Sequence, residues 1–309
     1  MAATENQERA GMSVSTISID WEDFGQLFCM YHHGIIGPPS KAIERQTNII
    51  LHILEERGVK ATFFVLGMLA KFRGDLVRKI AAQGHEIGIH GQNHQAMFTL
   101  TPDQAYVDLS ESLKLVQDIT GQKIYGYRAP FFSINESNLY VLEMLADLGL
   151  EYDSSIFPMK LSRYGIAGFN PKNTLYKLPN GKTIIELPLT IGNYFNKKVP
   201  IAGGGYMRAM PKFLVHKVFD DLNKSGVDSM MYMHPYEFDT EIIDVTSNYP
   251  PNASYSKAKT TLLNFKWNVF RNSIRDKIRM LLKEYKFATC IEKVNYVKNN
   301  GNSPVLLGR

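Results

Sequence analysis

Amphipathic helical segments alternate along this chain with short apolar segments, and a glycine separates the members of each pair. In residues 41–57, small or apolar side chains recur at helical spacing, at Ile43, Thr47, Ile50 and Leu54. Gly58 follows, and glycine often ends a helix because it adopts the left-handed backbone conformation without strain. The apolar residues 60–67 come next, and we expect them to form a strand.

The same unit recurs further along the chain. Thr101, Pro102 and Gln104 have the residue types of an N-cap, a first helical position and a capping box, and Gly121 ends the predicted helix that they begin. The other predicted helices cover residues 75–83, 137–148, 211–225 and 257–285. The other predicted strands cover residues 17–24, 85–91, 123–130, 150–157, 183–190, 228–235 and, as a closing strand, 287–294; residues 239–255 are predicted to be a long polar loop.

This alternation predicts an α/β fold with a parallel sheet, either open or closed into a barrel, because each parallel crossover needs a connecting helix. We see no linker that would separate a second core. We therefore expect one domain over residues 14–295, including a helical extension at its end, with polar tails at 1–13 and 296–309.

Composition narrows the class of protein. Of the 309 residues, 44% are apolar and 21% charged, which is typical of a globular chain, and the net charge of +5 is spread without the dense basic block expected of a nucleic-acid-binding protein. The two cysteines, Cys29 and Cys290, lie too far apart in sequence to indicate a thiolate zinc site or a disulfide framework. The polar N-terminus and the lack of a long apolar window predict a soluble, cytoplasmic protein without membrane insertion.

Reactive side chains stand near the ends of five predicted strands. In an α/β barrel the active site lies at the carboxyl ends of the strands and in the loops that follow them. Five strands that deliver such side chains to one rim indicate a site better than any single residue does. These residues are Asp20, His90, Arg128, Asp153 and His234.

The sharpest local signal is the segment "HGQNH". His90 and His94 are four residues apart, so on one helical turn both imidazoles can bind one metal ion. Such a pair alone is weak evidence, because two histidines at this spacing are more often ordinary surface or core residues. Gly91, which allows a sharp turn, and the carboxylates of "DWED" strengthen it. Two imidazoles and one carboxylate are a common ligand set for a catalytic divalent cation that keeps positions open for water.

The remaining strand-end residues have two interpretations each. "DWED" is either a solvated turn or a source of a metal ligand and a general base. Arg128 is either a surface cation or a fixed guanidinium that needs a carboxylate partner. His234 is either a core residue or a group that protonates a leaving amine, and Asp153 either orients that imidazole or caps the turn "DSS".

Taken together and in this order, the segments "SIDWED", "HGQNH", "YRAPFFS", "YDSSIFP" and "YMHP" resemble the motifs of the polysaccharide deacetylase family, also called NodB-homology or carbohydrate esterase family 4 enzymes. The resemblance covers about residues 16–293. It implies a distorted (β/α) barrel with about seven strands. Within the family, "AGGGYMR" and the tail "KWNVFRNSIRDKIRMLLKEYKF" are most similar to the branch associated with exosortase and exopolysaccharide gene clusters.

The resemblance implies a metal-dependent N-deacetylase that acts on N-acetylated amino sugars and releases acetate. By position, Asp20 is the expected general base, and His90 and His94 are expected to bind the metal. The expected metal is zinc, with another divalent transition metal as the alternative. The resemblance also gives Arg128 the role of orienting Asp20, His234 that of general acid and Asp153 that of its tuner. The N–H of Phe131, after Pro130, is expected to stabilise the oxyanion.

The chain departs from the commonest family pattern of two adjacent aspartates. Here Asp20 is followed by Trp21, Glu22 and Asp23. On an ideal strand Glu22 shares a face with Asp20, whereas Asp23 turns inward only if the chain has already left the strand. We expect Asp23 to be the metal ligand, since a short carboxylate is usual in the family, with Glu22 as the alternative.

Substrate identity is open at this level. Aromatic residues near the expected rim would stack on sugar rings or pack within loops, and Arg208 would recognise an acidic or hydroxyl-rich group or be a loop cation. Two alternative functions also stay open: an esterase or cyclic-amide hydrolase on a smaller substrate, and a catalytically silent glycan-binding module. The aromatic residues concerned are Trp21, Phe24, Phe131, Phe132, Tyr206 and Tyr236.

Overall fold

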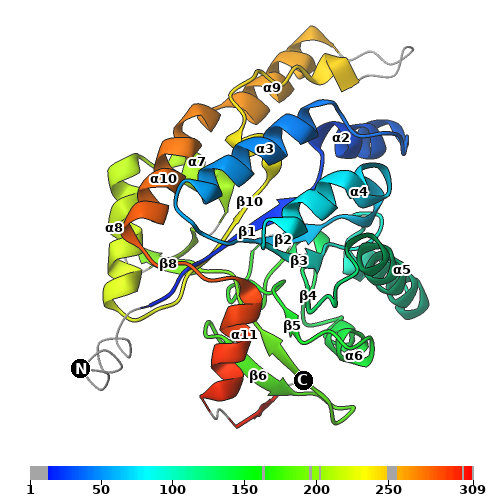
Figure 1. The fold of residues 1–309 in the computed structure, drawn as a ribbon, viewed down its shortest axis with the longest axis vertical. Helices are drawn as coiled ribbons and strands as arrows, with labels where there is room; N and C mark the ends of the chain where they lie inside the picture. The colour runs from blue at the N-terminus through cyan, green and yellow to red at the C-terminus, as the bar shows by residue number, and fades with distance from the viewer. Residues whose placement is uncertain are drawn as a thin grey trace.

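The fold is a mixed α/β structure built on one large, mostly parallel sheet (Figure 1). The computed structural model describes residues 13–161, 164–194, 197–201, 203–248, 256–300 and 303–307. The order of the strands is β10-β1-β2-β3-β4-β5-β7-β6-β11. Their bounds are β1 Thr16–Trp21, β2 Thr62–Val65, β3 Glu86–Ile89, β4 Gly126–Tyr127, β5 Tyr152–Asp153, β6 Thr174–Lys177, β7 Thr183–Glu186, β10 Met230–Met233 and β11 Val305–Leu306.

The first seven strands of that order, β10 to β7, run parallel, which confirms the predicted α/β fold. Within the described residues, however, the sheet does not close into a barrel, because β10 and β11 are its two edges. The segment after β7 lies against the β10 edge instead: the Met230 N–H donates to Thr190 Oγ1 at 2.6 Å, and Gly203 pairs with Tyr232. A separate two-stranded ribbon, β8 (Ile191–Tyr194) and β9 (Lys197–Pro200), connects these parts.

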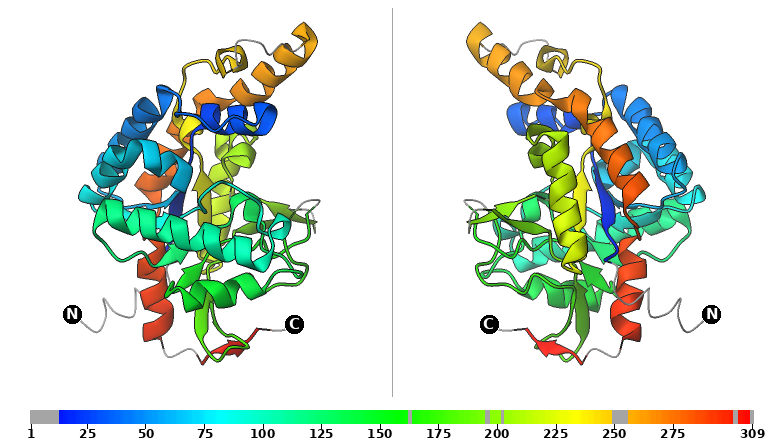
Figure 2. Two further views of the ribbon diagram at one scale, coloured as in Figure 1. Left: turned by 90° about the vertical axis from the view of Figure 1, so that its right-hand side faces the viewer. Right: turned by 90° about the vertical axis from the view of Figure 1, so that its left-hand side faces the viewer.

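Helices wrap the outside of the sheet in the packing order α8, α10, α3, α4, α5, α6. Figure 2 shows α5 and α8 on opposite sides of the molecule. The described α-helices are α2 Phe24–His33, α3 Ala42–Glu55, α4 Gly67–Ala82, α5 Pro102–Thr120, α6 Tyr140–Asp147, α7 Gly204–Ala209, α8 Lys212–Lys224, α9 Lys257–Asn268, α10 Ile274–Glu284 and α11 Cys290–Asn299. The described 3₁₀ turns are η1 Met97–Thr99, η2 Pro130–Phe132, η3 Pro235–Phe238, η4 Val245–Asn248 and η5 Arg271–Ser273. No helix in the described part of the chain is long and apolar enough to cross a membrane.

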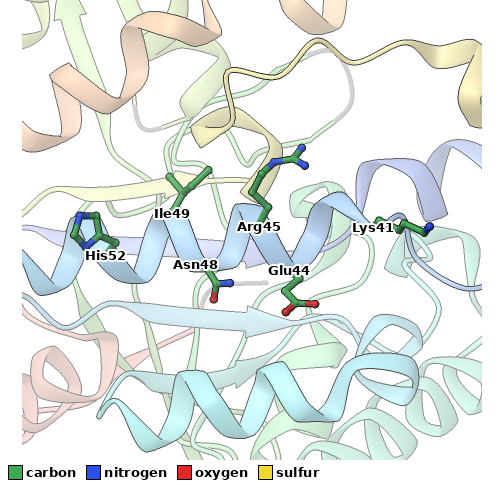
Figure 3. A pocket seen from close by; sticks show the side chains of 6 residues that line it. All are labelled: Lys41, Glu44, Arg45, Asn48, Ile49 and His52. Atoms are coloured by element: carbon green, nitrogen blue, oxygen red, sulfur yellow. The ribbon is translucent and has the colours of Figure 1, made fainter.

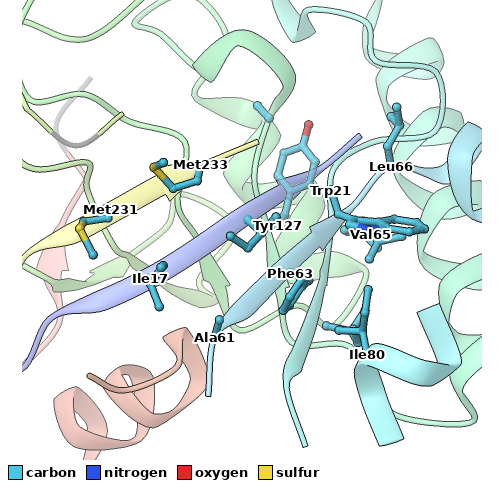
Figure 4. Packing of buried hydrophobic residues seen from close by; sticks show 14 of the residues in the cluster. Ile17, Trp21, Ala61, Phe63, Val65, Leu66, Ile80, Tyr127, Met231 and Met233 are labelled. Atoms are coloured by element: carbon cyan, nitrogen blue, oxygen red, sulfur yellow. The ribbon is translucent and has the colours of Figure 1, made fainter. Parts of the chain in front are cut away.

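The two faces of β1 divide the core. Ile17, Ile19 and Trp21 alternate with Ser18 and Asp20, so the apolar set faces the helices while the polar set faces the inside of the curved sheet. Figure 4 shows side chains of this outer layer from β1, β2, β10 and α4. Trp21 is buried there and its Nε1 donates to Thr47 Oγ1 at 3.0 Å, so the expectation that Trp21 lies at the rim is wrong.

Most predicted elements exist, and their ends agree where the sequence carried a capping signal. Helix α5 has the full capping box between Thr101 and Gln104 and ends at Gly121, whose φ is 65°. Strands β4 and β5 are only two residues long, because the predicted segments continue as the loops that carry the site.

Four expectations about the elements need correction. The predicted helix 257–285 is broken at Phe270, whose φ is 58°, so α9 and α10 are separate. The predicted strand 287–294 is mostly helix α11, which begins with a capping box between Thr289 and Glu292. Part of the predicted loop 239–255 forms η4. The segment predicted as the tail 296–309 includes the end of α11 and strand β11. Residues 1–12 and 249–255 lie outside the described residues. No helical or strand pattern in the sequence predicts α2, β6 or the β8-β9 ribbon.

Candidate metal centre and active site

The carboxylates of Asp20 and Glu22 lie on the inner side of the sheet, where β1 ends. Trp21 points the other way into the outer core, as strand alternation requires. The Glu22 N–H donates back to the Asp20 carbonyl at 3.0 Å, so the chain bends directly after the strand. Both carboxylates line the same cavity.

Asp23 has a different position from the one expected. It is the N-cap of α2, and Asp23 Oδ1 accepts from the N–H of Gln26 at 2.7 Å. Ser40 donates to the same carboxylate twice, through its N–H at 2.9 Å and its Oγ at 2.6 Å. The carboxylate beside the histidines is therefore that of Glu22 and not, as expected, that of Asp23, because the α2 cap and Ser40 together occupy both Asp23 oxygens.

Glu22, His90 and His94 form one buried cluster. Glu22 Oε2 lies 2.7 Å from His94 Nε2 and 3.6 Å from His90 Nε2, and the three potential ligand atoms all lie within 4.8 Å of one another. Among the described residues this is the group of histidine, cysteine and acidic side chains whose geometry suits a metal ion.

Each histidine is oriented by its other ring nitrogen. His90 Nδ1 lies 2.8 Å from the carbonyl oxygen of Arg128, which can only accept, so Nδ1 carries the proton. His94 Nδ1 lies 2.6 Å from Tyr31 Oη, and the Tyr31 hydroxyl also donates to the His94 carbonyl. Because that hydroxyl proton is used on the carbonyl, Tyr31 accepts from Nδ1–H. Both Nε2 atoms are thereby left with lone pairs that face Glu22.

This donor set fits a divalent cation. Two imidazole lone pairs and a carboxylate oxygen converge, and no described residue donates a hydrogen bond to Glu22 Oε2, although that atom is buried. Burial opposes ionisation of Glu22, yet in the protein without a metal ion protonated His94 and His234 hold its pKa well below the usual range; a bound cation would supply that positive charge when His94 offers its Nε2 lone pair. An ionised carboxylate among lone pairs needs a positive charge, and a cation supplies it.

The loop that carries the histidines is fixed from α5. Asp108 accepts from the N–H of Gln92 at 2.9 Å and from the N–H of Asn93 at 3.1 Å. Gly91 has a φ of 74°, and a Cβ there would come within 2.8 Å of the Asp108 carboxylate. The sharp turn expected at Gly91 is thus present, and it depends on this glycine.

Asp20 is held by Arg128, as the sequence suggested. Arg128 Nη1 donates to Asp20 Oδ1 at 2.7 Å, and both side chains are buried, at 0% and 2% exposure. The guanidinium also donates to Ser18 Oγ at 2.6 Å and to the carbonyl and hydroxyl of Ser154, each at 2.9 Å. The guanidinium carbon also lies 4.2 Å from the centre of the Phe64 ring. The orientation of Asp20 is therefore fixed by a cation that is itself held by four hydrogen bonds.

His234 faces Glu22 across the cavity. Its Nε2 lies 3.6 Å from Glu22 Oε1, and its Nδ1 lies 3.4 Å from Oε2 of Glu237. Burial lowers the pKa of His234, but the two carboxylates outweigh this and raise it to about 9. In the metal-free protein His234 is therefore protonated at neutral pH.

Asp153 does not orient His234. Its Oδ1 accepts from Ser155 Oγ at 2.6 Å and its Oδ2 from the Ser155 N–H at 3.1 Å, so of the two interpretations the turn cap is correct. Its other neighbour is Glu186 on β7. Burial raises the pKa of both carboxyls, and the nearby Asp153 charge raises that of Glu186 further.

The cluster opens into a cavity of about 890 Å³ with a largely aromatic wall. Phe131 is half exposed there, its ring 4.8 Å from that of His94, and its φ of 58° lies in the left-handed region. The lining residues are Asp20, Glu22, Phe24, Leu27, Phe28, Tyr31, His32, His90, His94, Ala96, Phe98, Phe131, Phe132, Tyr164, Tyr232, His234, Tyr236 and Trp267. Three residues expected at the substrate, Pro130, Tyr206 and Arg208, do not line this cavity.

A second hollow, of about 520 Å³, runs along α3 (Figure 3). All of its lining residues lie between positions 41 and 52, and Arg45 is bound to Asp239 at 2.7 Å and to Glu241 at 2.8 Å. The residues that line this hollow all come from α3 and its N-cap, so reactive groups from different elements do not meet in it. Its main structural feature is the Arg45–Asp239 pair, which ties α3 to the end of η3.

Two family models match the chain. The model described as "Polysaccharide deacetylase" matches residues 36–152, which include both histidines of the cluster and Arg128. Residues 36–152 therefore belong to the polysaccharide deacetylase family. The second model, described as a domain of unknown function (DUF3473), matches residues 154–295, which include His234 and Glu237.

Individual deacetylases support this family assignment. A peptidoglycan deacetylase of Helicobacter pylori is 30% identical over 115 residues, 37% of this chain and 38% of that protein. Chitin deacetylase 1 of Cryptococcus neoformans is 30% identical over 104 residues, 34% of this chain and 22% of that protein. The matched part of the chain thus spans less than half of either relative.

A crystal structure of a putative polysaccharide deacetylase from Mycobacterium smegmatis has the same fold as this chain. The TM-score is 0.62, with 20% sequence identity, over 97% of this chain and 95% of that one. At this level of identity the comparison supports the fold, and the assignment of the site depends on the residues described above.

Sequence reasoning missed several residues of this deacetylase-family site. Tyr31 lies on α2, a helix for which no periodic pattern was recognised, and Trp267 reaches the cavity from α9, far along the chain. Glu237 was detectable: it stands three residues after His234, the capping-box spacing, with Pro235 between them. Ser154 carried no distinguishing signal, because only the fold brings it to Arg128.

Proposed function

We propose that this protein is a metal-dependent hydrolase that removes N-acetyl groups from amino sugars of a polysaccharide or glycan precursor and releases acetate. One observation carries the proposal: a Glu22–His90–His94 cluster lies in the same cavity as Asp20, which Arg128 holds, and as His234. These are the ligand set, base and acid that hydrolysis of an amide requires.

Glu22, His90 and His94 would hold the metal. Two imidazoles and one carboxylate favour zinc among the divalent ions, with other divalent transition metals as alternatives. When bound, the metal would polarise the acetyl carbonyl and lower the pKa of a coordinated water. Tyr31 and the Arg128 carbonyl would keep the histidine Nε2 atoms directed at it, through the contacts of 2.6 Å and 2.8 Å described above.

Asp20 would act as the general base. Arg128 holds this carboxylate in place through a hydrogen bond of 2.7 Å, and Asp20 lines the cavity, so it can accept the proton of the attacking water. The water oxygen bonds to the acetyl carbon, and the N–H of Phe131 would donate to the oxygen that gains negative charge.

His234 would act as the general acid. Its Nε2 lies beside Glu22 in the cavity that Asp20 also lines, and it would donate its proton to the sugar nitrogen as the C–N bond breaks. Acetate and a free amino sugar are the products. The cavity offers aromatic rings from α2, η2, β10, η3 and α9, on which the apolar faces of sugar rings stack.

The names of the relatives agree with a glycan substrate, since they are a peptidoglycan deacetylase and a chitin deacetylase. Both names indicate a polymer of N-acetylated amino sugars. We propose the same substrate class for this chain and keep the cytoplasmic location as a prediction that cell fractionation tests.

The test is acetate release by zinc-loaded protein from a panel of N-acetylated sugars, including chitooligosaccharides and N-acetylglucosamine, alongside matching O-acetyl esters. The proposal predicts release from at least one N-acetylated sugar, faster than from its ester analogue. Acetate release from esters alone would identify an esterase instead. Binding of the oligosaccharides without any release would favour the silent glycan-binding alternative.

A further inference from the structure

The glycine-rich segment 203–208, which stood out in the sequence, contributes nothing to the cavity wall, although it packs against the loop that carries His234. It forms the start of α7, and Gly203 pairs in parallel with Tyr232, two residues before His234. This pairing brings the first turn of α7 directly behind η3.

Gly204 makes room for one side chain, that of Glu237. A Cβ at Gly204 would lie 1.9 Å from Glu237 Oε2 and 2.4 Å from its carboxyl carbon. A Cβ at the next residue, Gly205, would meet no atom within 4 Å. The Glu237 carboxylate can therefore occupy its position only if residue 204 is a glycine, whereas it places no such demand on residue 205.

Glu237 is a buried carboxylate, 1% exposed, with three partners. Its Oε2 accepts from the His234 N–H at 2.9 Å and lies 3.4 Å from the imidazole Nδ1. On the opposite side, Arg208 Nε lies 3.5 Å from Oε1. Arg208 also donates from Nη1 to the Trp267 carbonyl at 3.3 Å. A carboxylate this deeply buried needs such a cation, and Arg208 comes from the same short helix as Gly204.

The imidazole of His234 is confined on its other sides by aromatic rings. Tyr236 stacks on it with ring centres 5.6 Å apart, and Tyr232 meets it edge-on at 5.9 Å. The ring can therefore slide or rotate mainly toward Glu237. The carboxylate at Nδ1 fixes that remaining freedom, so that Nε2 keeps facing the cavity.

We propose that Glu237 is the positioning residue of His234, and that Gly204 and Arg208 form a brace that holds the Glu237 carboxylate against the imidazole. The inference deepens the proposed function, since it takes His234 as the general acid. It gives the glycine-rich segment a role in catalysis at a distance from the substrate. It also assigns to Glu237 the part that the sequence suggested for Asp153.

The experiment compares Gly204→Ala with its neighbour Gly205→Ala in the full-length, zinc-loaded protein. The first variant displaces the Glu237 carboxylate, whereas the second adds the same methyl group to the same helix in open space. We expect Gly204→Ala to lower kcat for acetate release about 10- to 100-fold with KM unchanged, the usual cost of losing such an outer partner. Gly205→Ala should stay within about 2-fold of the original protein, given its empty surroundings.

A double variant separates the brace from a general packing defect. Glu237→Ala should lower kcat by a similar factor, and Gly204→Ala in the Glu237→Ala background should cost nothing more, because the methyl group then enters vacated space. Glu237→Gln keeps the shape of the side chain and serves where the alanine variants fail to fold. Additive losses, or equal losses from the two glycine variants, would overturn the proposal.

A measurement that does not depend on catalysis tests the role of Glu237 independently of the proposed function. In the metal-free protein labelled with ¹⁵N at histidine, the ring signals of His234 should shift in Gly204→Ala and in Glu237→Gln, and stay in place in Gly205→Ala. Shifts of this pattern in a protein that releases no acetate would support the brace and reject the proposed function. Unchanged His234 signals in Glu237→Gln would reject the brace whatever the activity.

Discussion

Oε2 of Glu22 lies 2.7 Å from Nε2 of His94, whereas the adjacent carboxylate of Asp23 caps α2. The other ring nitrogen of His94, Nδ1, lies against Tyr31, which leaves the Nε2 lone pair facing the Glu22 carboxylate. A cation is the missing partner for two lone pairs and an ionised carboxylate that meet in a buried place.

Replacing Glu22 and Asp23 in turn distinguishes the two candidate metal ligands among the three carboxylates of "DWED". We expect Glu22→Gln to weaken cobalt or zinc binding by more than about 100-fold, since loss of an outer partner alone costs up to that factor. Asp23→Asn should bind metal normally, because asparagine is also a good N-cap. Cobalt absorption titration measures both, and normal binding by Glu22→Gln together with loss in Asp23→Asn would reverse the assignment.

Tyr31→Phe tests the orientation of His94. The variant removes the hydroxyl that accepts from His94 Nδ1, and we expect metal affinity to fall about 10- to 100-fold while the fold persists. Tyr106→Phe, on the surface of α5, is the matched control. Equal metal affinities for the two variants, measured by calorimetry, would show that Tyr31 does not orient the ligand.

Arg128→Met removes the cation that holds Asp20. The change leaves a buried carboxylate without its partner, so the free energy of unfolding should drop by about 3–5 kcal/mol. Arg73, which pairs with Asp75 at 2.8 Å on the surface, gives the comparison: Arg73→Met should cost no more than about 1 kcal/mol. Urea denaturation measures both, and a small loss in Arg128→Met would mean that Asp20 takes up a proton or finds another donor.

The Glu186 carboxyl predicts a pH dependence of stability. Burial and the Asp153 charge raise its pKa in the folded state above the ordinary value of 4.5. A raised folded pKa gives stability that is complete below the unfolded pKa and is lost as the pH rises through the folded one. The Glu186→Gln side chain cannot ionise, so the variant does not lose this stability. Its free energy of unfolding, relative to that of the original protein, should therefore increase as the pH rises above about 4.5, by up to about 1.4 kcal/mol per pH unit. A difference that does not change with pH would contradict the shift.

The gathering of the site residues was predictable, because parallel strands bring their carboxyl ends to one edge of a sheet. That rule brought side chains from four strands to one site: Asp20, His90 and His234 line the cavity, and Arg128 lies behind Asp20 and bonds to it.

The choice between neighbouring carboxylates was not predictable from the chain. Asp23 is occupied by Ser40, which is 17 residues away, and only the fold brings that donor close. In the same way, the spacing of three residues brings Glu237 close to His234, but only the fold shows that Gly204 of α7 leaves room for the Glu237 carboxylate. Local patterns therefore gave the elements and the strand ends, and tertiary contacts decided which carboxylate has which role.

The most direct test of the account is acetate release during a zinc titration of chelator-treated protein, with an N-acetylated sugar that the panel identifies as a substrate. The account predicts that activity rises linearly to one zinc per chain in the original protein and in Asp23→Asn, and that Glu22→Gln stays inactive over the same range. Full activity without zinc, or full activity of Glu22→Gln at one zinc per chain, would contradict it.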